Sequence, residues 1–350
     1  MSSDSLTWVK PREAREHIER CIRAGVVPYT TSSPGIGKSA IVRQIAKDYN
    51  LLLIDHRLST SAPEDLSGLP RFRADGRAEF SPFADLFPLE GDPLPEGYDG
   101  WLLHLDEFPH ASKSVQAAAY KLILDRMTGQ HKLHPQVAVA CSGNLMSDRA
   151  MVNPISTAMM SRMAHIHMVA DHEQWMEDVA IPQRYKPQIV AFLAANPNKL
   201  MDFDPNREDG TYCCNRTWEF TNSLIADFDG PVPNKMATLL RGVISPGVAT
   251  EFVQFTQVFD KLISLSEILA DPEHCRLPTE PNLYWATVTS LAVQTTMENL
   301  SKVVKYVERL TMTHKIIYYR SVRQYLVGFD ETDEWRDASI NIGQYLYSDN

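Results

Sequence analysis

A short glycine-containing segment between an apolar strand and an amphipathic helix constrains this sequence most. It reads SSPGIGKS at 32–39, after VVPYT at 26–30. Gly37, Lys38 and Ser39 match the end of the pattern Gly-x4-Gly-Lys-Ser/Thr, whereas Ser32 stands at its first glycine position. Such a turn directs backbone N–H groups toward an anion at the N-terminus of the following helix. The segment therefore predicts a P-loop that binds phosphate.

Each residue type in the loop suits that chemistry. Gly35 and Gly37 permit the backbone angles of a tight turn and a close approach of phosphate. Lys38 is expected to reach the β- and γ-phosphates of a nucleotide, and Ser39 to bind Mg²⁺. The position between a strand and a helix argues against a chance match. The predicted nucleotide-binding residues are Ser33, Pro34, Gly35, Ile36, Gly37, Lys38, Ser39 and Ala40.

A second candidate motif is WLLHLDEF at 101–108, an apolar run that ends in two carboxylates. The carboxyl end of a strand in an α/β sheet is where ligands bind. We expect Asp106 to hold Mg²⁺ and Glu107 to polarise the attacking water. The alternative is a pair of solvated carboxylates at a strand end, but their place 68 residues after Lys38 favours a functional pair. We interpret His104, within the apolar run, as a hydrogen-bonded core histidine rather than a ligand.

Short apolar strands alternate with helical segments up to about residue 180, and helical periodicity dominates afterwards. This pattern predicts an α/β domain with a parallel sheet, followed by an all-helical part. Residues 57–100 are the least regular part of the first domain, which is typical of a functional or mobile segment. The predicted strands are 26–30, 51–55, 101–107, 137–142 and 165–170, and the predicted helices of the α/β domain are 11–24, 39–49 and 115–124.

Composition narrows the possible partners and the cellular setting. The formal net charge is −10, which opposes binding to phosphate backbones, so nucleic acid is not expected as the main partner. No run approaches the roughly 20 apolar residues of a membrane span, and the N-terminus lacks the apolar core of a signal peptide. Five cysteines without metal-ligand spacing suggest reduced, buried thiols and a cytoplasmic protein.

These motifs together resemble the AAA+ superfamily, and within it the MoxR-like ATPases. VAVACS at 137–142 leads to Asn144, which matches the family's sensor 1, a polar side chain facing the γ-phosphate. The following stretch looks like the family's run from sensor 1 to the arginine finger, with Ser161-Arg162-Met163 in place of Asn-Arg-Phe. CNRTWEF at 214–220 resembles sensor 2, with Arg216 reaching the nucleotide of its own subunit. The matching motifs cover about residues 30–220.

The resemblance implies a domain organisation and an assembly. It implies an AAA+ α/β nucleotide-binding domain at 1–180, an all-α lid carrying sensor 2 at 181–272 and a C-terminal helical extension at 273–350. It also implies ATP and Mg²⁺ as ligands and a homo-oligomeric ring, with six subunits expected. Arg162 would then enter the neighbouring subunit's site. Arg149 also follows sensor 1 and remains an alternative finger.

By resemblance, ATP hydrolysis in the ring would drive remodelling or maturation of a protein client, as in a chaperone. MoxR-like proteins often act with a partner that carries a von Willebrand factor A domain. Phe72, Phe80 and Phe83 lie in the irregular segment and are candidates for gripping a client, although some of them could instead attach the segment to the core. Two alternatives stay open: a nucleic-acid motor or helicase loader, and an ATP-gated scaffold with little hydrolysis.

Overall fold

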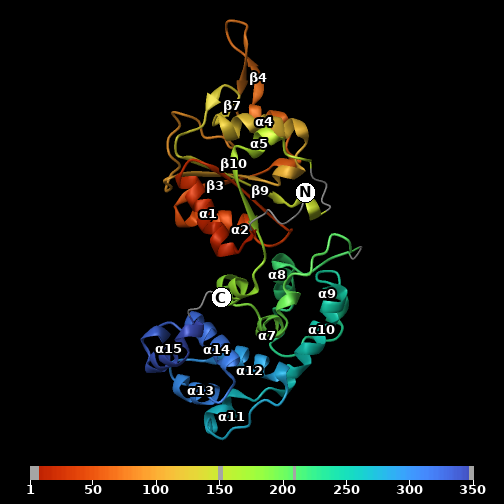
Figure 1. The fold of residues 1–350 in the computed structure, drawn as a ribbon, viewed down its shortest axis with the longest axis vertical. Helices are drawn as coiled ribbons and strands as arrows, with labels where there is room; N and C mark the ends of the chain where they lie inside the picture. Colours follow the sequence, from red (N-terminus) through yellow and green to blue (C-terminus); the bar gives the residue numbers. More distant parts are fainter. Residues whose placement is uncertain (1–7, 149–152, 208–209, 347–350) are drawn as a thin grey trace. The chain divides into compact units, whose positions relative to one another are not determined.

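The computed structural model describes residues 8–148, 153–207 and 210–346 of the chain (Figure 1). The chain forms two compact units. The first contains Met1–Ala170 with the short segment Asp204–Asn206, and the second contains Asp171–Phe203 with Arg207–Asn350. The predicted boundaries at residues 180 and 272 are not tested by this division and stay predictions.

The first unit is built on a six-stranded sheet in the order β1-β10-β2-β9-β6-β3, in which every neighbouring pair is parallel. Helices cover both faces of the sheet (Figure 1). This arrangement, followed by a helical C-terminal region, confirms the predicted P-loop NTPase fold class. The strands are β1 (Trp8–Val9), β2 (Val27–Ser32), β3 (Leu51–Arg57), β6 (Gly100–Asp106), β9 (Val137–Asn144) and β10 (Met163–Met168), and the main helices are α1 (Pro11–Arg23), α2 (Lys38–Asp48) and α4 (Lys113–Leu124).

The central strands β6 and β9 are buried on both faces, and polar side chains lie on one face near their carboxyl ends. Leu103, Leu105 and Val139 belong to the buried cluster that also contains Val115 and Ala119 of α4. Because successive side chains of a strand point to opposite faces, the even-numbered residues of β6 and β9 lie on the face that carries the P-loop helix α2. The polar residues at the ends of these strands therefore reach the loop before α2.

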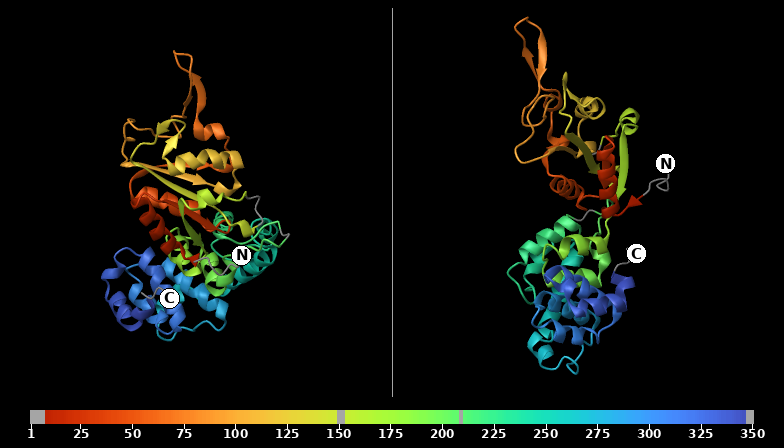
Figure 2. Two further views of the ribbon diagram at one scale, coloured as in Figure 1. Left: turned by 45° about the horizontal axis from the view of Figure 1, so that its top comes forward. Right: turned by 90° about the vertical axis from the view of Figure 1, so that its left-hand side faces the viewer.

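The segment 57–100 is more regular than the sequence predicts. It contains the short helix α3 (Pro63–Ser67) and a hairpin of β4 (Leu69–Phe72) and β5 (Ala78–Ser81), which projects from the sheet (Figures 1 and 2). Strands of four residues flanked by proline and glycine are too short for reliable detection of a period of two. Pairing of Arg71 with Glu79 and of Phe72 with Ala78 gives the hairpin a charged face and an apolar face.

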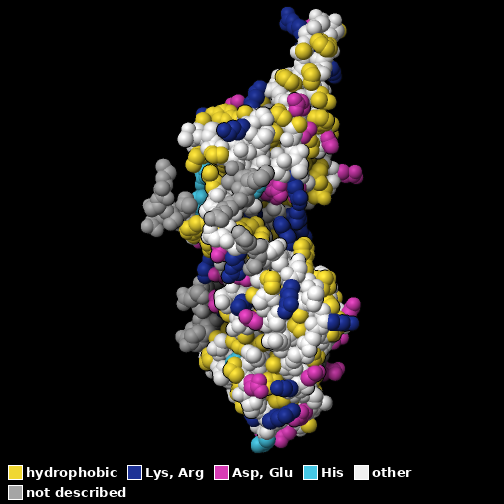
Figure 3. All heavy atoms as spheres, turned by 90° about the vertical axis from the view of Figure 1, so that its right-hand side faces the viewer, with side chains coloured by type: hydrophobic (Ala, Val, Ile, Leu, Met, Phe, Trp, Pro, Cys, Tyr) yellow, Lys and Arg dark blue, Asp and Glu magenta, His cyan; other side chains and the backbone are white. Residues whose placement is uncertain are grey.

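Hydrophobic and basic side chains are both visible on the projecting hairpin in the space-filling view (Figure 3). Phe72 is 78% exposed and Phe80 is 45% exposed, whereas Phe83 is half-buried. On the charged face, Arg71 Nε lies 3.1 Å from a carboxylate oxygen of Glu79. Phe72 is therefore the most accessible of the three aromatic residues singled out from the sequence.

The second unit is helical, and its described residues form no strand. One buried cluster surrounds Trp218 and Phe192, and another surrounds Tyr306 and Tyr318. Helix α15 lies within the C-terminal helical extension expected at 273–350. The α-helices are α6 (His172–Trp175), α7 (Pro187–Ala195), α8 (Asn215–Leu224), α9 (Met236–Leu240), α10 (Pro246–Thr256), α11 (Leu265–Ala270), α12 (Pro281–Gln294), α13 (Leu300–Val307), α14 (Met312–Tyr325) and α15 (Asp333–Leu346).

All five cysteines are free thiols; four are buried and Cys21 is half-buried. Within the described parts of the chain, no helix has both the length and the apolar character needed to cross a membrane.

Candidate nucleotide-binding site

The P-loop connects the end of β2 to the start of α2. Gly35 and Gly37 have φ angles of 80° and 116°, values that residues with a Cβ atom rarely adopt. Gly37 is the N-terminal flanking residue of α2, and Lys38 is its first residue. The predicted binding residues 33–40 therefore occupy the loop and the first turn of the helix, where backbone N–H groups lack helical partners.

Lys38 is buried, and its ammonium group is folded back onto the loop. It donates hydrogen bonds to Ser32 Oγ at 2.9 Å and to the Ser32 carbonyl oxygen at 3.2 Å. It also lies 3.0 Å from Oδ1 of Asn144, at the end of β9. Ser32, which replaces the first glycine of the motif, thus contributes its side chain to the site. From the sequence alone, Ser32 was only a departure from the P-loop motif.

Ser39 and Asp106 meet at the edge of the sheet. The Ser39 hydroxyl donates to Asp106 Oδ2 at 2.8 Å. Oδ1 of the same carboxylate accepts from the Ser142 hydroxyl and, at 2.8 Å, from the backbone N–H of Glu107. Burial disfavours the charged form of Asp106, but the nearby His104 imidazole and these hydrogen bonds outweigh it and hold the pKa of Asp106 below its ordinary value.

Glu107 follows β6 in a left-handed backbone conformation, with φ 55° and ψ 34°. This conformation is uncommon for a residue with a side chain, and such residues cluster at functional sites. The Ser59 hydroxyl donates a hydrogen bond to Glu107 Oε2. Ser59 follows β3, the strand that pairs with β6, so the sheet places it beside Glu107. No motif in the sequence pointed to Ser59.

Asn144 is placed by the register of the sheet and by a glycine. It pairs with Ser32 across β2 and β9, which brings the two side chains that contact Lys38 to neighbouring positions. A Cβ on Gly143 would lie 2.2 Å from Cδ of Pro109, so any larger residue would displace the turn that follows Glu107. Glycine at position 143 therefore allows the turn after Glu107 to pack closely beside Asn144 at the carboxyl edge of the sheet.

Asp148 is a further acidic residue near the P-loop that the sequence motifs did not identify. It ends a short turn after Asn144. Burial raises the pKa of Asp148, whereas the positive charge of Lys38 and a hydrogen bond from Ser33 act in the opposite direction. Its place four residues after Asn144 was the only available signal, and that spacing alone indicates no function.

Of the two candidate arginine fingers, Arg149 and Arg162, only Arg162 belongs to the described residues. Arg149 lies outside the described residues. Arg162 is half-buried, and its guanidinium carbon lies 5.0 Å from the centre of the Tyr120 ring on α4. One terminal nitrogen of Arg162 bonds the carbonyl oxygen of Ala158 and lies 3.3 Å from Ser161 Oγ. Arg162 is thus held at the surface of the first unit and does not contact Lys38 or Asp106 among the interactions described.

Arg216 belongs to the second unit. It is the second residue of α8, and its side chain is exposed. Its proposed contact with the nucleotide stays a prediction.

The donors and acceptors of the first unit fit a magnesium–nucleotide complex. The first turn of α2 and the ammonium of Lys38 provide the positive end that a phosphate chain requires. Ser39 Oγ and Asp106 Oδ2 are adjacent oxygen atoms, the ligand type that Mg²⁺ prefers. A carboxylate, an amide and a hydroxyl therefore surround the position next to the phosphate-binding loop.

No family model and no curated relative matches the chain. Solved structures similar to it include a proposed ATPase from Cytophaga hutchinsonii, with 15% identity and a TM-score of 0.37 over 96% of this chain and 90% of that chain. The Holliday junction branch migration motor RuvB of Thermotoga maritima has 16% identity and a TM-score of 0.35, with 85% of each chain covered. NtrX from Brucella abortus in complex with ADP has 13% identity and a TM-score of 0.34, covering 95% and 67%. Similarity at this level carries no functional argument.

Proposed function

We propose that the chain binds Mg·ATP at the P-loop and hydrolyses it. The observation that carries this proposal is the convergence of four predicted residues from three elements. Lys38 and Ser39 begin α2, Asp106 ends β6 and Asn144 ends β9, and their side chains lie within hydrogen-bond distance of one another in two pairs. A chance match to the P-loop pattern would not require Asp106 and Asn144 to contact the loop residues Ser39 and Lys38.

Each residue has a defined role in this proposal. Lys38 would exchange its contacts with Ser32 and Asn144 for contacts with oxygens of the β- and γ-phosphates. The new contacts would be charge-assisted hydrogen bonds. Ser39 and Asp106 would hold Mg²⁺, which supplies charge neutralisation to the phosphate chain. Glu107 would orient and deprotonate the attacking water, and Ser59 would hold its carboxylate before the nucleotide is bound.

Hydrolysis is tested by measuring phosphate release from Mg·ATP by the parental protein and by Glu107→Gln, each with and without DNA. We expect hydrolysis by the parental protein, little effect of DNA, and a rate reduced at least about 100-fold in the variant. ATP affinity of Glu107→Gln should stay near the parental value. Strong stimulation by DNA would instead favour a nucleic-acid motor. Tight ATP binding with no measurable hydrolysis by the parental protein would favour an ATP-gated scaffold.

We further propose that the chain is a MoxR-like AAA+ protein that forms a homo-oligomeric ring, with six subunits expected. Arg162 would complete the site of the neighbouring subunit, and Arg216 would contact the nucleotide of its own subunit. The five free thiols agree with the cytoplasmic setting proposed from the sequence. These statements are supported by the sequence motifs, by the half-buried position of Arg162 between α5 (Thr157–Met160) and β10, and by the exposed position of Arg216 at the start of α8.

The client of the ring is proposed to be a protein, with a von Willebrand factor A domain protein as a candidate partner. The apolar face of the β4–β5 hairpin supports this proposal. Pro70, Phe72, Ala78 and Phe80 share that face, and Phe72 is 78% exposed. Exposed aromatic side chains of this kind are enriched where proteins bind proteins.

A further inference from the structure

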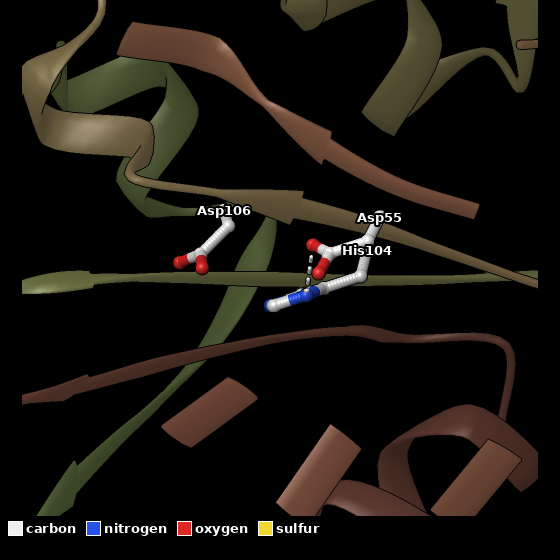
Figure 4. A group of neighbouring side chains, drawn as sticks. All are labelled: Asp55, His104 and Asp106. Carbon is white, nitrogen blue, oxygen red and sulfur yellow. Dashed lines mark hydrogen bonds and ion pairs between the residues drawn. The ribbon is translucent and has the colours of Figure 1, made fainter. Parts of the chain in front are cut away.

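A row of hydrogen-bonded polar side chains, two of them fully buried, continues from the proposed magnesium-binding edge into the sheet. His104 on β6 pairs in register with Asp55 on β3, and its Nδ1 lies 3.1 Å from Asp55 Oδ1 (Figure 4). The other ring nitrogen, Nε2, lies 2.9 Å from Ser142 Oγ on β9. The Ser142 hydroxyl in turn donates to Asp106 Oδ1. The four residues thus form one hydrogen-bonded chain across three strands.

The middle of this hydrogen-bonded row is too deeply buried to be a solvated surface feature. His104 and Ser142 both have 0% exposure, whereas Asp55 is exposed at the far end. Leu102, two positions before His104 on the same face of β6, is apolar and equally buried, so this face of the strand also holds a hydrophobic side chain. A buried polar group left without a partner is destabilising, so every member of such a hydrogen-bonded row has to be satisfied.

The two oxygens of Asp106 have different partners. Oδ1 accepts hydrogen bonds from the Ser142 hydroxyl and from the backbone N–H of Glu107. Oδ2 accepts a hydrogen bond from the hydroxyl of Ser39, the other proposed magnesium ligand. Fixing Oδ1 in this way determines which oxygen faces the ion. Partners of this kind, which hold a metal ligand without touching the metal, commonly change metal affinity when removed.

The same side chains could be considered as metal ligands themselves. Asp55, His104 and Asp106 offer ligand atoms within 4.8 Å of one another. However, both ring nitrogens of His104 already contact protein groups, Asp55 on one side and Ser142 on the other. The geometry therefore favours a supporting role over direct ligation.

We propose that Asp55 and His104 are positioning residues for Asp106. Asp55 orients the imidazole, the imidazole holds the Ser142 hydroxyl, and Ser142 fixes Asp106 so that Oδ2 faces Ser39 and Mg²⁺. This inference rests on the proposed function of the site as a Mg·ATP site. It adds two residues that no nucleotide-binding motif in the sequence includes.

The test compares His104→Leu, Ser142→Ala and their combination with the parental protein. Two quantities are measured: the Mg²⁺ concentration that half-saturates ATP hydrolysis, and the affinity for ADP in excess EDTA. We expect each single variant to raise the half-saturating Mg²⁺ concentration about 10- to 100-fold. The ADP affinity without Mg²⁺ should change less than about twofold, because Lys38 and the loop are untouched. The double variant should be no worse than the poorer single variant, because both substitutions break one chain.

Two further variants separate positioning from packing. Leu102→Val removes a methylene from the same buried face of β6 and should lower the melting temperature without changing the Mg²⁺ requirement. Asp55→Ala lies at the exposed end of the chain, where folding is least affected, and should raise the Mg²⁺ requirement. Asp55→Asn keeps an oxygen opposite Nδ1 and should restore part of the loss.

The possible failures are distinct. If His104→Leu and Asp55→Ala keep the parental Mg²⁺ requirement, the inference is wrong even though the site binds Mg·ATP. If His104→Leu does not fold, Asp55→Ala alone decides between the two outcomes. If the parental protein shows no Mg²⁺-dependent nucleotide binding, the proposed function fails, and the inference fails with it.

Discussion

The ammonium group of Lys38 lies 3.0 Å from the side-chain oxygen of Asn144, so the first residue of the P-loop helix and the last residue of β9 are in direct contact. Ser32, the register partner of Asn144, accepts a second hydrogen bond from the same ammonium. The lysine is thus held among oxygen atoms that phosphate oxygens can replace. This arrangement leads to the first prediction.

Lys38→Ala should weaken nucleotide binding about 10- to 100-fold, because it removes a charged donor from the phosphate-binding loop. The measurement is calorimetric titration with ADP and with a non-hydrolysable ATP analogue. Lys47→Ala is the matched control, since Lys47 lies on the same helix but is exposed. Parental affinity in Lys38→Ala would show that the loop is not the phosphate site.

Ser59→Ala should change the basal rate of hydrolysis while leaving nucleotide affinity nearly unchanged. The Ser59 hydroxyl bonds the Glu107 carboxylate, and its removal frees that carboxylate to orient water. We expect a several-fold higher basal rate, measured as phosphate release at saturating Mg·ATP. In the Glu107→Gln background the same substitution should have no effect, because the catalytic carboxylate is then absent. An effect of equal size in both backgrounds would contradict the assigned contact.

Arg162→Ala should leave ATP binding nearly intact and reduce hydrolysis by about 10³-fold, if Arg162 acts across a subunit boundary. The rate per subunit of the parental protein should then rise with protein concentration until rings form. Mixing Arg162→Ala with Lys38→Ala subunits should restore activity that neither variant has alone. Arg20→Ala, an exposed arginine on α1, is the control. If Arg162→Ala is fully active and Arg149→Ala is inactive, the finger is Arg149.

Phe72→Ser should preserve basal hydrolysis and thermal stability but abolish stimulation of hydrolysis by an unfolded polypeptide such as casein. Phe72 is 78% exposed on the hairpin, so little buried area is lost in the free protein. Val327→Ser is the control, because Val327 is 94% exposed in the second unit and lies outside the hairpin. Equal stimulation in the Phe72 variant and the parental protein would remove the hairpin from the proposed client surface.

Stability should fall as the pH drops below the ordinary histidine pKa of 6.5. Burial lowers the pKa of four histidines, His56, His167, His172 and His314. Between pH 6.5 and each lowered pKa the unfolded chain binds more protons at these histidines than the folded one does. Their contribution to the free energy of unfolding therefore decreases as the pH falls, and it is constant above this window. His172→Gln should therefore lose less stability than the parental protein between about pH 7.5 and 5.5 in urea unfolding. Equal losses would mean that His172 does not contribute.

The amino-acid sequence by itself determined the site's main residues and the class of fold. The P-loop has local causes, because glycines at 35 and 37 allow the positive φ angles and Lys38 begins the helix. The apolar runs that form β6 and β9 are also local, since strands buried on both faces need no alternation. Asp106 and Glu107 could be predicted because the carboxyl end of a strand in such a sheet is where ligands bind. Asn144 was predicted from the resemblance to the family's sensor 1.

Only the tertiary structure decided which other side chains join them. Ser59, Ser142 and Asp148 have no motif, and they reach the site because strand register and loop geometry bring distant residues together. His104 was predicted as a bonded core histidine, but its partners Asp55 and Ser142 lie 49 and 38 residues away in sequence. The β4–β5 hairpin was missed because each of its strands has only four residues, too few to show a period of two, so the pairing of the two strands decides the structure of this segment.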